Sequence, residues 1–440
     1  MGVSFPVGWR AMGGAFTRPR PTPHVPHWTW TRWRSSILVA ALAIAALLLS
    51  ACSVEQFLLP TSTPSAVQDS QPQRTSDPLV PTPVPGSEAE QNEDEPELSE
   101  AGAVKLADFT PAALAEPYST RWRVGVGVPD GKSPLIYAWP DSYPGWYLNW
   151  SVGHLATGNS GSPVDVAPDL VVPPDDEAGM AFAPMVRTPR GKLTPDADLL
   201  AATVAQLPGR TWLIGNEPDV RWQDNATPEE YARAYHLAYT TIKEADPTAQ
   251  VAIAGLSQIT PLRLEYLDRV WDFYREEYGE EMPVDVWNMH AFVLQEKADD
   301  WGVDIPPGMP EVTHGMQWQI EEHDDLELVA FQVELMRRWM REHGQQQKPL
   351  WITEYGILMP ESYGFYPGVV TTFMLDSFDL FEKLRDPELG FAEDEDRLVQ
   401  RWVWFSAGYD LYPTGDLFTR DGAPKQLMLA LAAYLDTRDP

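Results

Sequence analysis

Short apolar runs alternate with longer amphipathic segments along the chain beyond Tyr118. Runs rich in Val, Ile, Trp and Phe are typical of strands, and the amphipathic stretches between them are typical of crossover helices. Eight runs have this character: Trp122 to Val128, Trp146 to Val152, Met180 to Arg187, Thr211 to Asn216, Val251 to Ser257, Val284 to His290, Leu350 to Glu354, and Leu398 to Phe405. The pattern therefore predicts an α/β fold in the form of a closed (β/α)₈ TIM barrel.

Two helices have clear sequence signals. The run Thr227-Pro228-Glu229-Glu230 offers an N-cap, a proline at the first helical position and a capping-box glutamate, so a helix is predicted from there through Lys243. Apolar residues recur at helical spacing from 328 to 339, and the helix should stop at His343-Gly344. The first crossover is predicted to be a loop, because four prolines between 129 and 144 leave little room for a helix.

Two connections are unusually long, Gly153 to Gly179 and Phe292 to Asp325. Both follow predicted strand ends and are rich in polar, Pro and Gly residues. In a barrel of this kind, loops that follow strands lie on the face that carries the functional site. We expect these two loops to shape a binding cleft.

The N-terminal region predicts export. An apolar stretch from Ile37 to Leu49 is shorter than the roughly 20 residues that span a bilayer, and it suits a signal sequence. The run Leu49-Ser50-Ala51-Cys52 resembles a lipobox, and Cys52 is the only cysteine, so lipidation of Cys52 is expected. An uncleaved anchor helix or a buried thiol is the alternative. The basic residues ahead of the apolar stretch are Arg10, Arg18, Arg20, Arg32 and Arg34.

Composition divides the chain into three parts. Residues 1–52 form the predicted lipoprotein signal peptide, and residues 53–117 form a Pro- and Glu-rich segment that is predicted to be a disordered linker. Residues 118–440 form the predicted catalytic domain. The expected location is the outer face of the cell membrane or the cell surface, with membrane contact through the lipid anchor only.

The formal net charge of -32 argues against nucleic acid as a partner. A charge of this sign is compatible with a neutral polysaccharide, but it suits simple solubility equally well.

Polar residues stand where the predicted strands end. Glu217 follows the fourth run and Glu354 ends the seventh. Two carboxyl groups that face each other across a pocket can divide the roles of acid and nucleophile in breaking a glycosidic bond. The other polar or aromatic side chains at strand ends include Asn149, Trp150, Arg187, Asn216, His290 and Trp404.

These residues resemble clan A glycoside hydrolases, which carry an Asn-Glu-Pro after the fourth strand and a second glutamate after the seventh. Within the clan, the segments 146–150, 182–185 and 215–219 look like glycoside hydrolase family 128, a family of β-1,3-glucanases. The resemblance covers most of Trp122 to Leu435. Arg187 departs from it, since a Trp is expected there, and that departure bears on the glucan preference.

The resemblance implies a role for each residue. Glu217 would be the general acid/base and Glu354 the nucleophile of a retaining double displacement. Asn216 would bind the sugar hydroxyl beside the reacting carbon, and His290 would orient substrate or tune a carboxylate. Trp150 and Trp404 would stack on sugar rings, Asn149 would bind substrate, and Arg187 and Tyr355 would hold the carboxylates. The expected partner is an oligosaccharide or polysaccharide, and no cofactor or metal is expected.

Other interpretations stay open. Asn-Glu-Pro alone is equally typical of a solvated turn, His290 of a core histidine, and the tryptophans of simple packing. Another clan A activity, such as a mannanase, xylanase, galactanase or transglycosylase, has the same motifs. A non-catalytic carbohydrate-binding lipoprotein on a barrel scaffold is the alternative of a different class.

Overall fold

The computed structural model describes residues 112–154, 176 and 178–438. The predicted signal peptide, Cys52 and almost all of the predicted linker lie outside the described residues. Of the predicted long loop Gly153 to Gly179, only the ends are described. In the described part of the chain, no helix has the length and apolar character needed to cross a membrane.

All nine strands of the described residues pair in parallel. They form a six-stranded sheet in the order β3-β2-β1-β9-β8-β7 and a three-stranded sheet in the order β4-β5-β6. The strands are β1 (Val124–Gly127), β2 (Trp146–Leu148), β3 (Ala181–Phe182), β4 (Met185–Val186), β5 (Thr211–Asn216), β6 (Gln250–Gly255), β7 (Trp287–His290), β8 (Leu350–Tyr355) and β9 (Arg401–Trp404).

The eight predicted runs all contain a strand, so the predicted α/β alternation is confirmed. The third run contains two strands, because the pair Ala183-Pro184 separates β3 from β4. This pair still bonds to both neighbours: Ala183 N–H donates to Tyr147 O at 2.9 Å, and Pro184 O accepts from Leu213 N–H at 2.9 Å. One β-bridge, Ala252 with Val286, links β6 to the residue just before β7.

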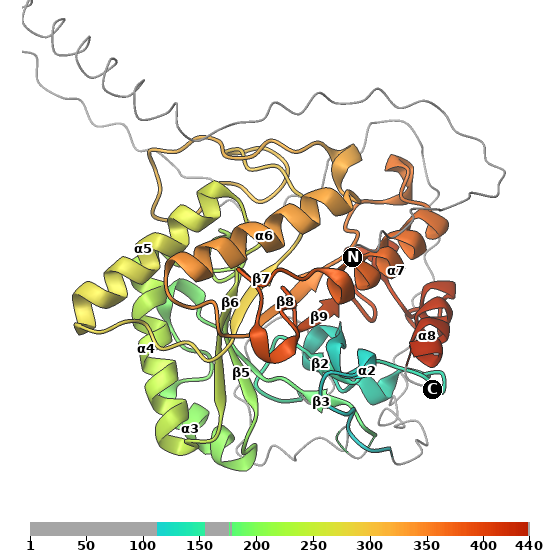
Figure 1. Ribbon diagram of the computed structural model, residues 1–440, viewed down its shortest axis with the longest axis horizontal. Coiled ribbons are helices and arrows are strands. Elements are labelled where there is room, and N and C mark those ends of the chain that lie inside the picture. Colours follow the sequence, from blue (N-terminus) through green and yellow to red (C-terminus); the bar gives the residue numbers. More distant parts are fainter. Residues whose placement is uncertain (1–111, 155–175, 177, 439–440) are drawn as a thin grey trace, which may run out of the picture. The chain divides into compact units, whose positions relative to one another are not determined.

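The strands lie between helices (Figure 1). The helices are α2 (Thr120–Arg123), α3 (Ala197–Gln206), α4 (Pro228–Ala245), α5 (Pro261–Tyr278), α6 (Leu326–Glu342), α7 (Pro367–Lys383) and α8 (Gln426–Arg438). The first run was predicted to be extended from Trp122, but Ser119 caps α2 and the strand begins only at Val124. As predicted, the first crossover has no α-helix, only two short 3₁₀ turns at Pro129–Gly131 and Pro134–Ile136.

Both predicted helix signals are confirmed. Thr227 and Glu230 form the reciprocal capping box at the start of α4. Helix α6 ends at His343 and is followed by Gly344, whose φ is 70°. Such caps satisfy backbone groups at helix ends that would otherwise have no partner.

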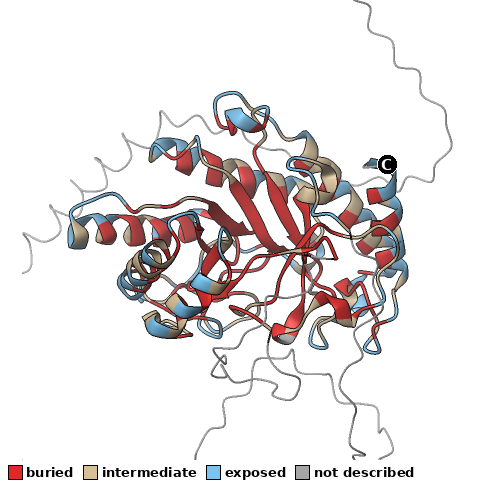
Figure 2. Cartoon of the chain, turned by 90° about the horizontal axis from the view of Figure 1, so that it is seen from below, coloured by how far each residue is buried: buried red, intermediate tan, exposed pale blue. Residues whose placement is uncertain are grey.

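Alternate strand residues enter two apolar clusters, because successive side chains of a strand point to opposite sides. The inner cluster contains Trp146, Leu148, Ala183, Met185, Leu213, Ala252, Val286, Trp351 and Val403. The larger outer cluster joins the other strand side chains to the helices. Figure 2 shows this burial: the strands are buried except at the first residues of β3, β5 and β6, whereas the helices are buried on the side toward the strands and exposed on the other.

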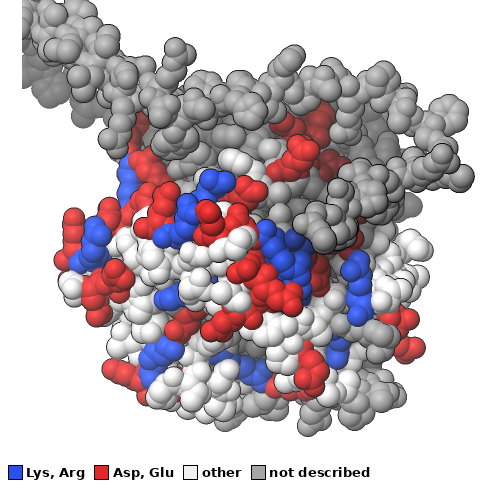
Figure 3. All heavy atoms as spheres, viewed as in Figure 1, with Lys and Arg blue, Asp and Glu red and all other residues white. Residues whose placement is uncertain are grey.

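Acidic and basic side chains are interspersed on the face shown in Figure 3, and acidic groups cover more of it. This distribution agrees with the net charge of -32. No continuous basic surface is seen on the described part of this face.

Candidate active site

Glu217 lies directly after β5, at its carboxyl end. Its backbone has a φ of 43°, a left-handed conformation that non-glycine residues rarely adopt. Its N–H donates to Gly255 O, in β6, at 3.1 Å, and its side chain is 11% exposed. A backbone conformation of this kind in a buried acidic residue is a known mark of functional sites.

Glu354 comes from the other sheet. It lies in β8, opposite His290 of β7 in the strand register, and its side chain is 7% exposed. The Trp150 indole Nε1–H donates to its Oε1 at 2.5 Å. The nucleophile predicted from sequence is therefore buried, and it has a hydrogen-bond donor aimed at one oxygen.

His290 lies between the two glutamates. Its Nδ1 is 2.9 Å from Glu217 Oε1, and its Nε2 is 3.6 Å from Glu354 Oε1. The ring packs so closely on β6 that a Cβ at Gly255 would come 2.2 Å from His290 Cδ2. The absence of a side chain at Gly255 thus leaves the space that the imidazole occupies. The position of the ring beside two carboxyl groups favours a functional role for His290 over that of an ordinary core histidine.

The three side chains converge on one point. One oxygen of Glu217, one nitrogen of His290 and one oxygen of Glu354 all lie within 4.8 Å of one another. Retaining glycosidases hold their carboxyl groups about 5 to 5.5 Å apart, and inverting ones about 6.5 to 9.5 Å apart. One oxygen of Glu217 and one oxygen of Glu354 therefore face the same point in the site.

Burial and charge shift two pKa values in this cluster. Burial raises the pKa of Glu354 to about 7, against the opposing effects of His290, the Trp150 hydrogen bond and Arg187. Burial lowers the pKa of His290, but the nearby Glu354 and Glu217 carboxylates outweigh this effect and raise it overall. The two carboxyl groups therefore favour the protonated form of the His290 imidazole, and near pH 7 the charge of Glu354 is finely balanced.

The same three residues are the one group in the described chain with donor atoms close enough for a metal ion. The glutamates, however, lie against different nitrogens of the same imidazole ring.

Asn216 and Arg187 lie on the Glu217 side of the site. Asn216 ends β5; its Oδ1 is buried and accepts no hydrogen bond from the described protein atoms. Arg187 Nε donates to Asp224 at 2.7 Å, and its charge acts on Glu354. Both residues are thus joined to the end of β5 and its following loop, and their roles toward substrate stay predictions.

Trp150 contacts Glu354 of the glutamate pair through its indole N–H and not through a ring face open to a sugar. Its indole Nε1–H holds Glu354, and its ring lies over β1, where a Cβ at Gly127 would come 2.6 Å from it. Phe405 meets the ring edge to face at 5.6 Å. Trp150 is thus first a hydrogen-bond donor to the carboxylate.

Trp404 and Tyr355 are not in the site, and their predicted roles are wrong. Trp404 is fully buried on the outer side of β9, and its Nε1–H donates to Gly415 O at 2.7 Å. The Tyr355 hydroxyl lies 3.0 Å from Ser377 Oγ of α7. Each follows an inward-facing residue in its strand, so the alternation of a strand turns it toward the helices.

Asn149 also differs from its prediction. Its amide donates to Gly153 O at 3.1 Å and to Lys132 O at 3.3 Å, and its Oδ1 accepts from Ser151 N–H. These bonds hold the backbone around Trp150, so Asn149 shapes the loop and does not offer its side chain to substrate.

The sequence interpretation missed two buried aspartates beside Glu217. Asp219 accepts from Ser257 Oγ at 2.7 Å and from Arg263 Nε at 3.1 Å. Asp224 accepts from Asn216 N–H at 2.8 Å, as well as from Arg187. Both belong to the segment that follows Glu217, and an acid so near an Asn-Glu-Pro run was the signal available in the sequence.

An aromatic cluster beside the site was missed as well. Phe405, Tyr409 and Tyr412 follow β9, and their rings lie 5.6 to 6.4 Å apart. The pKa of Tyr412 is raised by burial, by Tyr409 and by Glu217. These rings, and not Trp404, form the aromatic side of the site.

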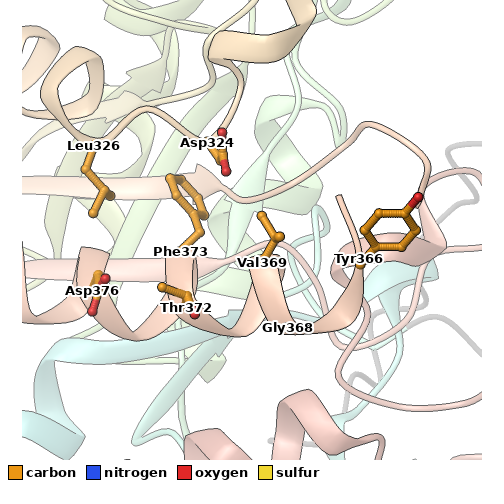
Figure 4. Close-up of a pocket in the computed structure, with 8 residues that line it drawn as sticks. All are labelled: Asp324, Leu326, Tyr366, Gly368, Val369, Thr372, Phe373 and Asp376. Atoms are coloured by element: carbon orange, nitrogen blue, oxygen red, sulfur yellow. The ribbon is translucent and has the colours of Figure 1, made fainter. Parts of the chain in front are cut away.

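A surface groove between the start of α6 and the first half of α7 does not contain this chemistry. Figure 4 shows its lining, which includes Asp324, Leu326, Tyr366 and Phe373. Neither glutamate lines this groove, so the candidate active site rests on the convergence of side chains and not on this groove.

The site is thus a pair of buried carboxyl groups flanking an imidazole at the carboxyl ends of parallel strands. No family model and no curated protein matches the chain.

Solved structures of glycoside hydrolase family 128 are similar to the chain at low identity. An endo-β-1,3-glucanase of subgroup II from Pseudomonas viridiflava has 17% identity over 71% of this chain and 96% of that chain, with a TM-score of 0.47. A subgroup I endo-β-1,3-glucanase from Amycolatopsis mediterranei, in complex with laminarihexaose, has 17% identity over 71% and 98%, with a TM-score of 0.42. A curdlan-specific exo-β-1,3-glucanase of subgroup III from Blastomyces gilchristii has 18% identity over 70% and 97%, with a TM-score of 0.43. At these values the likeness alone assigns no activity to this chain.

Proposed function

We propose that this chain is a retaining glycoside hydrolase that cleaves β-linked polysaccharide, with β-1,3-glucan as the favoured substrate. The observation that carries the proposal is the approach of Glu217 and Glu354 to within 4.8 Å, from strands that are 137 positions apart in the chain. A second carboxyl group at this distance is what a covalent glycosyl intermediate requires. The sugar preference rests on the sequence motifs and is the less specific part of the proposal.

Glu354 is the nucleophile in this mechanism. Its carboxylate attacks the anomeric carbon while Glu217 gives its proton to the departing oxygen, which leaves a covalent glycosyl-enzyme and an ionised Glu217. Glu217 then takes a proton from water, and the hydroxide released from that water displaces Glu354. The Trp150 N–H and the charge of Arg187 stabilise the carboxylate of Glu354 before attack and after release.

His290 sets the proton balance of the pair. Hydrogen-bonded to Glu217 and 3.6 Å from Glu354, a protonated imidazole offsets the repulsion of two carboxyl groups in a buried site. Asn216 Oδ1, which accepts no bond from the described protein, is placed to receive the sugar hydroxyl beside the reacting carbon.

We further propose that the two sheets make one (β/α)₈ barrel. Three observations support this: the Ala183-Pro184 link between β3 and β4, the bridge from Ala252 to Val286, and an inner cluster with residues from both sheets. A barrel of this kind brings the carboxyl ends of all its strands to one face, where Glu217 and Glu354 would meet.

Export and lipid attachment at Cys52 remain part of the proposal. They rest on the sequence of residues 1–52 alone, and incorporation of a labelled fatty acid into the wild type but not into Cys52→Ser would test them.

The activity test uses reducing-sugar release from a panel of β-glucans, mannan, xylan and galactan. The wild type should cleave at least one β-glucan, while Glu217→Gln and Glu354→Gln should lose nearly all activity. Glu276→Gln, an exposed change on α5, is the matched control and should behave as the wild type. Products observed by NMR at early times should retain the anomeric configuration.

Equal sugar release from all four proteins would refute the assigned roles. Cleavage of mannan, xylan or galactan only would replace the substrate and keep the mechanism. Binding of glucan without any cleavage by the wild type would favour the non-catalytic alternative.

A further inference from the structure

The segment that follows Glu217 is a compact loop with an exposed tip. Val220 N–H donates to Glu217 O at 3.0 Å, Gln223 N–H donates to Val220 O at 3.0 Å, and Asp224 N–H returns to Asn216 O at 3.3 Å. The base of the loop is therefore the functional strand end itself, and residues 221–223 are exposed at its tip.

Trp222 stands at this tip. Among the described residues it is the only tryptophan in the exposed class, with 42% of its surface accessible. It is five residues from Glu217, and five residues of even fully extended chain span at most about 18 Å. The indole therefore lies within reach of a polysaccharide chain bound at Glu217.

The ring is held in place from one side. Arg221 Cζ lies 4.8 Å from the Trp222 ring centroid. The same guanidinium is fixed at its Nη1 by Asp304 Oδ2 at 2.9 Å and by Asp299 Oδ1 at 3.1 Å, both in the long connection after β7. Since the Asp304 side chain is only 9% exposed, the clamp has a rigid anchor.

Arg221 lies against one side of the indole, and 42% of the Trp222 surface is still accessible. Pre-organised aromatic faces bind flat apolar surfaces at low entropic cost, because little side-chain freedom remains to be lost. A sugar ring in a β-linked glucan presents one face of C–H groups, which is the ligand surface that matches an exposed indole face.

We propose that Trp222, clamped by Arg221, is a binding platform for a sugar residue that lies outside the cleaved linkage. The inference rests on the proposed function and deepens it: the enzyme would favour chains long enough to reach the platform. The platform acts on binding and takes no part in the chemical step.

The test compares laminarihexaose with laminaribiose, a chain too short to bridge the scissile centre and the platform. For Trp222→Ala we expect kcat/KM on laminarihexaose to fall about threefold to tenfold, mainly through KM, with no change on laminaribiose. Trp222→Tyr should recover most of the loss, since it keeps an aromatic face. Arg221→Ala should give a smaller loss with the same substrate dependence.

Phe331→Ala is the matched control, because Phe331 on α6 has the same 42% exposure. Phe331→Ala should leave kcat/KM unchanged on both substrates. A ratio of the two kcat/KM values that is unchanged in Trp222→Ala would overturn the platform.

Failure of the proposed function has a different signature, namely no hydrolysis by the wild type. In that case, laminarihexaose is titrated into each protein while its intrinsic fluorescence is measured, and this tests whether Trp222 binds the sugar. Loss of the response in Trp222→Ala alone supports the platform, and an identical response in all variants overturns it.

Discussion

Replacing Glu354 by glutamine should abolish hydrolysis and yet stabilise the folded protein at alkaline pH. Glutamine keeps the shape of the side chain and an oxygen for the Trp150 N–H, but it carries no charge. The carboxylate of Glu354 is costly in the folded state because burial raises its pKa from 4.5 to about 7. Functional residues that are optimised for chemistry commonly carry such a cost in stability.

The size of the effect follows from proton linkage. A raised pKa means that the folded state holds the Glu354 proton more tightly than the unfolded chain does. The resulting stability is fully present below the unfolded pKa of 4.5 and is lost as pH rises through about 7. At about 1.36 kcal/mol per pKa unit, a change from 4.5 to about 7 corresponds to about 3 kcal/mol in total, of which about 2 to 3 kcal/mol lies between pH 5 and pH 8.

Two effects reduce the stability that Glu354→Gln gains at high pH. A neutral acceptor makes a weaker bond with Trp150 than a carboxylate does, and His290 loses a nearby negative charge that favours its protonated form. We therefore expect Glu354→Gln to be about 1 to 3 kcal/mol more stable than the wild type at pH 8, and nearly equal to it at pH 5.

Urea unfolding at pH 5, 6, 7 and 8 measures the difference directly. Glu276→Gln, on the exposed side of α5, should stay within about 0.5 kcal/mol of the wild type at every pH. A Glu354→Gln protein that is less stable than the wild type by the same amount at all four pH values would refute the reasoning, since its carboxylate would then carry no burial cost.

Three further predictions concern the same site and its support. The kcat/KM of the wild type should fall as pH drops below about 7, because protonation of Glu354 removes the nucleophile; a flat profile from pH 5 to 8 would contradict this. Arg263→Met should lower the free energy of unfolding by about 3 to 5 kcal/mol, because two buried carboxylates lose their cation, whereas the exposed Arg275→Met should cost less than about 1 kcal/mol in urea melts. Asp224→Ala should lower kcat about 100-fold with a smaller change in KM, because it frees Arg187 and the end of β5; unchanged single-turnover rates would count against that role.

The sequence could predict the strands and the two glutamates because both are local signals. Runs of Val, Ile and Trp determine where the chain is extended, and a carboxyl group at the end of such a run needs only the parallel arrangement to reach the common face. The same logic led to Asn216, at the end of β5, and to His290, which lies beside both glutamates. It also explains why the third run gave two strands: Pro184 has no N–H to continue the ladder on both sides.

The wrong predictions concern residues whose role depends on the side of the strand to which the side chain points. Glu354 and Tyr355 are neighbours in β8, so only one of them can face the site, and the buried hydroxyl contact with Ser377 shows that it is Glu354. In the same way, Val403 belongs to the inner cluster and Trp404 to the outer cluster. Had strand alternation been applied to both runs, Tyr355 and Trp404 would have been assigned to the helix-facing layer from the sequence alone.

The long-range support of Glu217 is a different matter, because no local pattern encodes it. Asp219 meets Ser257 and Arg263, which lie 38 and 44 positions further along the chain, and Arg263 also reaches Glu296. The Arg263 guanidinium lies between these two carboxylates only when β5, α5 and the loop after β7 are brought together. The geometry of the segment from Glu217 to Asp219 therefore depends on residues that sequence motifs at the site cannot reveal.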